Sequence, residues 1–200
     1  GVSRMASLEI ILEKASRSYL KEEKEALCEQ KNAIYRDFLK QLQPSDCSED
    51  VRSTLKVLRD DGIQLSIGSA SKNTRFILER INLLDAFDQI VDGTMISHSK
   101  PNPEVFLLAA EKLGLAPNEC GVVEDAYAGI EAAKAGGFDA YGIGDASHSP
   151  LTDHPLHALS DLLPLVLDKQ ENQPVLKLEH LGKTYPNGFV ATKDFNLDIY

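Results

Sequence analysis

Three short segments of the sequence carry side chains that suit phosphoryl chemistry. The first is Gly68-Ser69-Ala70-Ser71-Lys72-Asn73, which follows an apolar run and opens a helical pattern. Small residues let a phosphate approach backbone N–H groups, and the N-terminus of a helix adds a partial positive charge. Ser69 would add a hydroxyl donor and Lys72 a full charge. The alternative is an ordinary strand-to-helix turn in which Ser71 or Asn73 caps the helix.

The second segment is Ser99-Lys100-Pro101-Asn102-Pro103. Its two prolines stiffen the chain, which would hold the Lys100 ammonium where a phosphate could use it. The alternative is an exposed lysine ahead of a helix that begins with proline.

The third segment is Glu124-Asp125, which ends the apolar run Gly121-Val122-Val123 and opens a helix. Carboxylate oxygens beside a phosphate suit Mg²⁺. Asp125 could instead cap the helix, but a cap needs one such residue and this segment has two. A hydroxyl, a lysine and two carboxylates in one place would make a Mg²⁺-assisted phosphoryl-transfer site.

The elements that must position these segments alternate between short apolar strands and amphipathic helices from about residue 48 onward. We expect strands at 63–68, 89–91, 120–123 and 140–143, and helices at 51–60, 73–81, 103–113, 126–135 and 156–167. This alternation is typical of βαβ units and a parallel sheet. The carboxyl ends of parallel strands share one edge, so the three segments would converge there.

The regions on either side of this core show different patterns of apolar and polar residues. Residues 7–41 show only helical spacing and predict a helical pair, which is too small to bury much apolar surface alone. Residues 169–174 are polar and predict a linker. Residues 175–200 alternate like the two strands of a hairpin, with a turn signal at Tyr185-Pro186-Asn187-Gly188.

The composition limits the function classes. The 200 residues carry a net charge of −10, which disfavours binding to nucleic acid or to an anionic membrane. No apolar run approaches the roughly 20 residues of a membrane helix, so we expect no membrane insertion. Cys28, Cys47 and Cys120 lack metal-type spacing, and their odd number argues against a disulfide framework. A reduced, cytoplasmic setting is the simplest expectation.

Residues 1–168 resemble the haloacid dehalogenase-like superfamily and, within it, the β-phosphoglucomutase family. The resemblance rests on SASKN (69–73), KPNPEVF (100–106) and VEDAYAGIEAAKAGG (123–137), and on Gly1-Val2-Ser3-Arg4, which is similar to the start of that family's helical cap. It implies an α/β fold with a parallel-sheet, Rossmann-like core at 43–168. It also implies a partial helical cap at 1–42.

The resemblance also implies roles for individual residues. Ser69 and Lys100 would hold the transferring phosphoryl group, and Lys31 would contact the substrate from the cap. Glu124 and Asp125 would bind Mg²⁺. The sugar's other phosphate would be held by Arg4, Ser71, Lys72 and Asn73, and Ala70 would be a further residue that binds substrate or phosphate.

The implied reaction is the interconversion of β-glucose 1-phosphate and glucose 6-phosphate through a phospho-aspartate and a bisphosphate. Sugar-phosphate phosphatases of the same fold carry similar motifs, so hydrolysis is the alternative. Arg4 together with Lys72-Asn73 favours the mutase.

One family motif is missing from the sequence. The family's DxD, whose first aspartate accepts the phosphoryl group, lies on the first strand and precedes the GVSR segment. Nothing precedes Gly1 here, and Asp60-Asp61 and 85–88 do not follow apolar strands. We therefore expect the core to lack its first strand, and residues 1–200 alone to form no aspartyl-phosphate.

The tail VLKLEHLGKTYPNGFVATKDFNLDI (175–199) resembles the start of the ATPase subunits of ABC-type sugar importers. Tyr185 would match the adenine-stacking aromatic of that family, but no G-x-x-x-x-G-K-[ST] phosphate loop follows. The resemblance implies an association with a sugar importer through the tail, or a non-catalytic fragment fused to such a subunit. The alternative is an unrelated hairpin.

Overall fold

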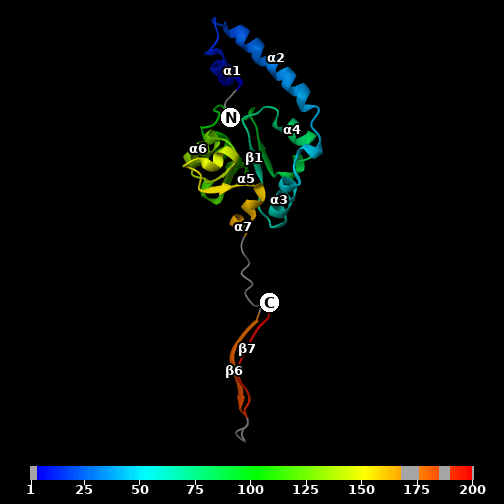
Figure 1. Cartoon of the computed structure of the whole chain (residues 1–200), viewed down its shortest axis with the longest axis vertical. Helices are drawn as coiled ribbons and strands as arrows, with labels where there is room; N and C mark the ends of the chain where they lie inside the picture. The colour runs from blue at the N-terminus through cyan, green and yellow to red at the C-terminus, as the bar shows by residue number, and fades with distance from the viewer. Residues whose placement is uncertain (1–3, 168–175, 185–189, 200) are drawn as a thin grey trace. The chain divides into compact units, whose positions relative to one another are not determined.

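The computed structural model describes residues 4–167, 176–184 and 190–199, and among side chains those of Met5 and residues 7–167 (Figure 1). The chain divides into two compact units, Gly1–Val166 and Leu167–Tyr200.

The core of the first unit contains parallel strands in two groups. Strand β1 (Ser66–Gly68) pairs with β2 (Gln89–Val91), with Ile67 opposite Ile90. Strand β3 (Gly121–Glu124) pairs with β4 (Asp139–Ile143), which pairs in turn with β5 (His154–Leu156). All three pairings are parallel, which confirms the α/β class.

Helices connect these strands as the βα alternation predicts. The α-helices of the core are α3 (Glu49–Asp60), α4 (Thr74–Arg80), α5 (Glu104–Leu113), α6 (Tyr127–Gly136) and α7 (Leu163–Val166). Short 3₁₀ turns lie at Pro44–Asp46, Leu84–Ala86, Pro117–Glu119, Gly144–His148 and Leu159–Leu162. Helices α5 and α6 both end at a glycine in the left-handed conformation, Gly114 and Gly137, which closes the last turn.

An apolar cluster joins the two groups of strands. Val91 from β2, Val105 from α5 and Ile130 from α6 are each fully buried in it. The rings of Phe106 and Phe138 meet edge to face at 6.2 Å. This packing fixes the carboxyl ends of β1, β2 and β3 relative to one another.

The helix predicted over 156–167 is wrong at its start. His154–Leu156 forms the edge strand β5, and the helical turns begin only at Leu159. Pro155 has no N–H to donate, so it is tolerated on a strand that pairs on one side only. Leu156 is 1% exposed, and its apolar character reflects burial on the sheet rather than on a helix.

The predicted helical pair is present as α1 (Arg4–Leu12) and α2 (Lys21–Leu39). Figure 1 shows the two helices together, apart from the sheet and the helices that cover it. Lys24 of α2 forms an ion pair with Glu9 of α1 at 2.8 Å. Several apolar side chains of the pair stay exposed, among them Ile10, Ile11, Ile34 and Phe38.

Thr54 of α3 gives a test of core packing. Its side chain is 1% exposed, and its hydroxyl has no hydrogen-bond partner among the described residues. We expect Thr54→Val to raise the free energy of unfolding by about 1 kcal/mol, because valine keeps the shape and removes an unsatisfied polar group. Denaturant unfolding measures this, with Ser53→Ala as the control, since the Ser53 hydroxyl already donates to Glu49 O at 2.7 Å. Unchanged stability of Thr54→Val would contradict the expectation.

The second unit contains two antiparallel strands where the alternation predicts them. They are β6 (Leu176–Thr184) and β7 (Val190–Ile199), with Leu178 opposite Leu197. The predicted linker 169–174 and the turn at 185–188 lie outside the described residues. No helix in the described parts of the chain is long and apolar enough to cross a membrane.

Candidate active site

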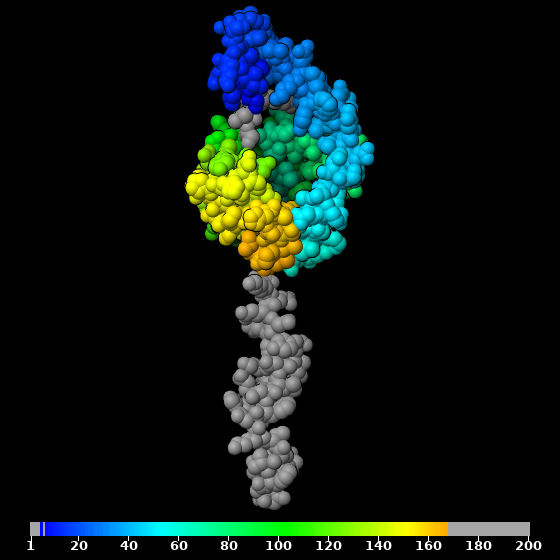
Figure 2. All heavy atoms as spheres, viewed as in Figure 1, coloured from blue at the N-terminus to red at the C-terminus, as the bar shows by residue number. Residues whose placement is uncertain are grey.

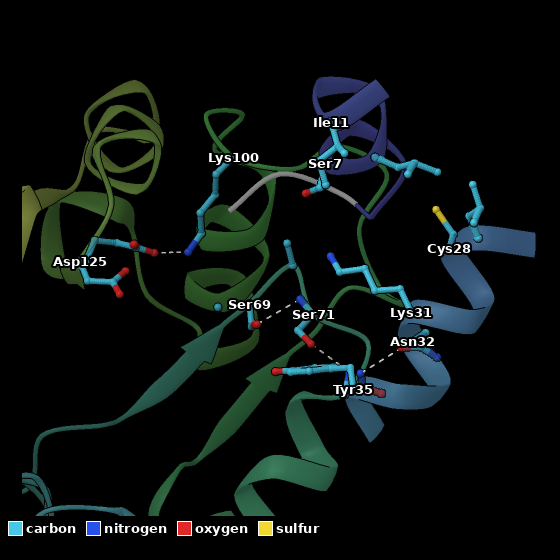
Figure 3. Close-up of a pocket in the computed structure, with 16 residues that line it drawn as sticks. Ser7, Ile11, Cys28, Lys31, Asn32, Tyr35, Ser69, Ser71, Lys100 and Asp125 are labelled. Atoms are coloured by element: carbon cyan, nitrogen blue, oxygen red, sulfur yellow. Dashed lines mark hydrogen bonds and ion pairs between the residues drawn. The ribbon is translucent and has the colours of Figure 1, made fainter. Parts of the chain in front are cut away.

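A cavity of about 540 Å³ lies between the helical pair and the carboxyl ends of the strands. Figure 2 shows the surface hollowed beneath α1 and α2, and Figure 3 shows the lining side chains. Most of the residues that the sequence singles out line this one cavity: Lys31, Ser69, Ala70, Ser71, Asn73, Lys100, Glu124 and Asp125. The convergence expected from parallel strands is therefore present.

The loop after β1 is held by hydrogen bonds of its own. The Ser69 N–H donates to Val91 O at 2.9 Å, and the Ser69 hydroxyl accepts from the Ser71 N–H at 3.1 Å. A Cβ on Gly93 would lie 2.1 Å from the Ala70 carbonyl oxygen, so only glycine allows this approach. The Asn73 side chain makes no capping hydrogen bond to α4, whereas the Ser71 hydroxyl accepts the Asn73 N–H at 3.1 Å.

Lys100 is buried, which contradicts the alternative of an exposed lysine. Its side chain is 9% exposed, and its Nζ forms an ion pair with Oε1 of Glu124, whose side chain is 10% exposed. The ammonium also lies 4.5 Å from the ring centroid of Phe106, within reach of a cation–π contact. The peptide bond between Lys100 and Pro101 is cis. A positive charge is thus held against the wall of the cavity.

The two carboxylates at the end of β3 differ in their surroundings. The Glu124 side chain packs against α6 and pairs with Lys100, whereas Asp125 is exposed at the cavity. In the described part of the chain, no group of three or more His, Cys, Asp or Glu side chains could hold a metal ion. Two carboxylates fit Mg²⁺ nevertheless, because this ion keeps several waters and completes its shell with phosphate oxygens.

Three of the predicted phosphate contacts have different outcomes. Asn73 is 8% exposed, and its Nδ2 donates to Asn32 Oδ1 on α2 at 3.4 Å. Lys72 is exposed and is not among the residues that line the cavity. The side chain of Arg4 lies outside the described residues. Their roles stay predictions.

Helix α2 supplies lining residues that the sequence reading did not single out. Cys28, Asn32 and Tyr35 line the cavity together with Lys31 (Figure 3). The four positions follow the i, i+3, i+4, i+7 spacing of one helix face. Once Lys31 is assigned to the substrate side, this spacing is the signal that could have found the others.

Comparisons with known proteins place the chain in a family. The haloacid dehalogenase-like hydrolase family matches residues 3–137. The chain is 35% identical to β-phosphoglucomutase of Bacillus subtilis (strain 168) over 175 residues, which cover 86% of this chain and 77% of that protein. It is 31% identical to a phosphorylated carbohydrates phosphatase of Thermotoga maritima over 148 residues, 72% of this chain and 65% of that protein.

A crystal structure of β-phosphoglucomutase from Clostridium difficile superposes with a TM-score of 0.75 at 32% identity, covering 81% of this chain and 74% of that one. The family match over residues 3–137 includes Lys31, Ser69, Lys100, Glu124 and Asp125. The chain therefore belongs to the haloacid dehalogenase-like hydrolase family, within which it is β-phosphoglucomutase-like.

Proposed function

We propose that this protein is a Mg²⁺-dependent β-phosphoglucomutase that interconverts β-glucose 1-phosphate and glucose 6-phosphate. The observation that carries the proposal is the meeting of Ser69, Lys100, Glu124 and Asp125 in one cavity that α2 covers with Lys31. The 35% identity to the Bacillus subtilis mutase supports the choice of reaction.

In this proposal Lys100 and Ser69 hold the phosphoryl group that is transferred. The Lys100 ammonium is buried and fixed, so it can stabilise charge that develops on the phosphoryl oxygens without reorganising. The Ser69 hydroxyl donates a further hydrogen bond. The second phosphate of the sugar would lie against the loop of Ser71 and Asn73, with Lys31 contributing charge from α2.

Glu124 and Asp125 would hold Mg²⁺. The ion supplies positive charge that neutralises phosphate oxygens and orients them for in-line transfer. Of these two ligands, Asp125 is exposed, and Glu124 shares its carboxylate with Lys100.

The phosphoryl acceptor is not among the described lining residues in this proposal. Among the lining residues that the structure describes, Glu124 and Asp125 are the only carboxylates, and both are assigned to Mg²⁺. We therefore expect residues 1–200 by themselves to show no turnover. The chain spans 77% of the length of the Bacillus subtilis mutase, and the activity proposed here is that of the whole protein.

The test supplies the full-length protein with β-glucose 1-phosphate, Mg²⁺ and a catalytic amount of glucose 1,6-bisphosphate. The expected result is glucose 6-phosphate in amounts equal to the substrate consumed, and loss of the reaction with a chelator. Stoichiometric release of inorganic phosphate without need for the bisphosphate would instead identify a sugar-phosphate phosphatase. The similarity to the Thermotoga maritima phosphatase makes this the second candidate.

An association of the tail with a sugar importer is a separate proposal. It rests on the resemblance of residues 175–199 alone, since the family match ends at residue 137. A cytoplasmic location follows from the proposed sugar-phosphate substrate, which is made and used inside cells.

A further inference from the structure

The chain segment just before Lys100 is hydrogen-bonded to the carboxylate of Glu104. Glu104 Oε1 accepts the Ser97 N–H at 2.8 Å, and Oε2 accepts the His98 N–H at 2.7 Å. The His98 ring Nδ1 lies 2.9 Å from the same Oε2. Both oxygens of Glu104 are therefore bound to the chain just ahead of Lys100.

The residues after Lys100 are also held by hydrogen bonds. Glu104 is the first residue of α5, and its N–H donates to Asn102 Oδ1 at 3.0 Å. The Asn102 N–H donates to Ser99 O at 3.1 Å. Lys100 thus lies midway along a loop whose two ends, at Ser97 and Glu104, are bonded to each other.

These bonds favour the ionised carboxylate. The N–H groups of Ser97 and His98 hold the pKa of Glu104 below its ordinary value, with a smaller contribution from the His98 ring. A carboxylate in the first turn of a helix also interacts favourably with the helix dipole. Glu104 is therefore an acceptor for both N–H groups at neutral pH.

The same helix turn supports the far end of the Lys100 side chain. Phe106 lies two residues after Glu104, and its ring is 4.5 Å from the Lys100 ammonium. The first turn of α5 thus fixes the backbone of the loop through Glu104 and contacts the charged group through Phe106. A shift of the loop would move the ammonium away from both Glu124 and the phosphate position.

We propose that Glu104 is a positioning residue that sets where the Lys100 ammonium stands in the cavity. The proposal rests on the function proposed above. Glu104 itself lines no part of the cavity and touches no reacting group, so its effect must pass through the loop.

The test compares Glu104→Gln with Glu104→Asp in the full-length protein. Glutamine has a single acceptor oxygen, so one of the two backbone N–H groups loses its partner. We expect kcat/KM to fall on the order of 100-fold, as misplacement of a catalytic group by about 1 Å can do. Asp keeps both acceptor oxygens and should recover part of the loss. Glu111→Gln, an exposed position on α5, is the matched control and should behave as the unchanged protein.

Two further measurements separate this proposal from the proposed function. Hydrogen exchange of the Ser97 and His98 amides should speed up at least tenfold in Glu104→Gln and not in Glu111→Gln. The affinity for inorganic phosphate should fall in parallel. Exchange and phosphate affinity at unchanged values would overturn the role of Glu104. Fast exchange and weakened phosphate binding in a protein that transfers no phosphoryl group would overturn the proposed function alone.

Discussion

Lys100→Met is expected to abolish phosphoryl transfer and to destabilise the fold at the same time. Methionine retains most of the side-chain volume and removes the ammonium, with its charge and its hydrogen-bond donors. The Glu124 carboxylate, 10% exposed, would then be left buried without its partner. Removing one member of a buried ion pair costs about 3–5 kcal/mol, because the remaining charge is uncompensated. The loss of turnover should reach at least about 10³-fold, as for the removal of a preorganised charge in a water-excluded site.

A second variant separates the two effects of Lys100. In Lys100→Met/Glu124→Gln neither group carries a charge, so most of the lost stability should return while turnover stays lost. Denaturant unfolding and mutase turnover of the full-length protein measure the two quantities. Lys112→Met removes an exposed lysine from α5 and serves as the control. If Lys100→Met alone is as stable as the unchanged protein, the ion pair does not hold Glu124 in solution.

The core motifs were predictable because Ser69 follows β1 directly, Glu124 ends β3, and Lys100 lies in the connection from β2 to α5. In a parallel α/β fold, a polar residue after a short apolar run lies at the carboxyl edge of the sheet. Ser69, Lys100 and Glu124 therefore share a cavity, as expected from their positions alone. Their burial was less accessible to prediction. Lys100 reads as a surface lysine until the ring of Phe106 and the carboxylate of Glu124 are placed around it.

The sequence could not indicate the role of Glu104. An acidic residue in the first turn of a helix is common, and the helix dipole explains it without any further contact. Its bonds to Ser97 and His98 depend on how the loop turns back, which is a property of the folded chain.

Strand β5 was missed for a related reason. Apolar residues at 156, 159, 162 and 163 fit a helical spacing, and proline at 155 suits a helix start as well as an edge strand. Only the pairing of Gly142 with Pro155 in β4 and β5 decides between them. Local pattern and tertiary pairing compete here, and pairing prevails because it buries Leu156 fully.

Gly129→Ala is expected to weaken Mg²⁺ binding and turnover while leaving the protein folded. Gly129 is the third residue of α6, where alanine would ordinarily stabilise a helix by about 1 kcal/mol. A Cβ at this position would lie 2.2 Å from both Cδ and Oε2 of Glu124. The carboxylate must therefore move, and it is held in place from the other side by Lys100. The glycine in the helix is explained by this close approach.

The expected result is a 10- to 100-fold lower Mg²⁺ affinity, of the order seen when the support of a metal ligand is lost. Calorimetric titration of the full-length protein with Mg²⁺ measures the affinity, and denaturant unfolding measures the fold. Glu131→Ala, an exposed substitution on the same helix, controls for changes in helix propensity. If helix propensity alone governs the site, Gly129→Ala will be more stable and bind Mg²⁺ normally, which would refute the steric argument. If the carboxylate is displaced, stability will fall short of the helix-propensity gain and Mg²⁺ affinity will drop with it, because both depend on where Glu124 can lie.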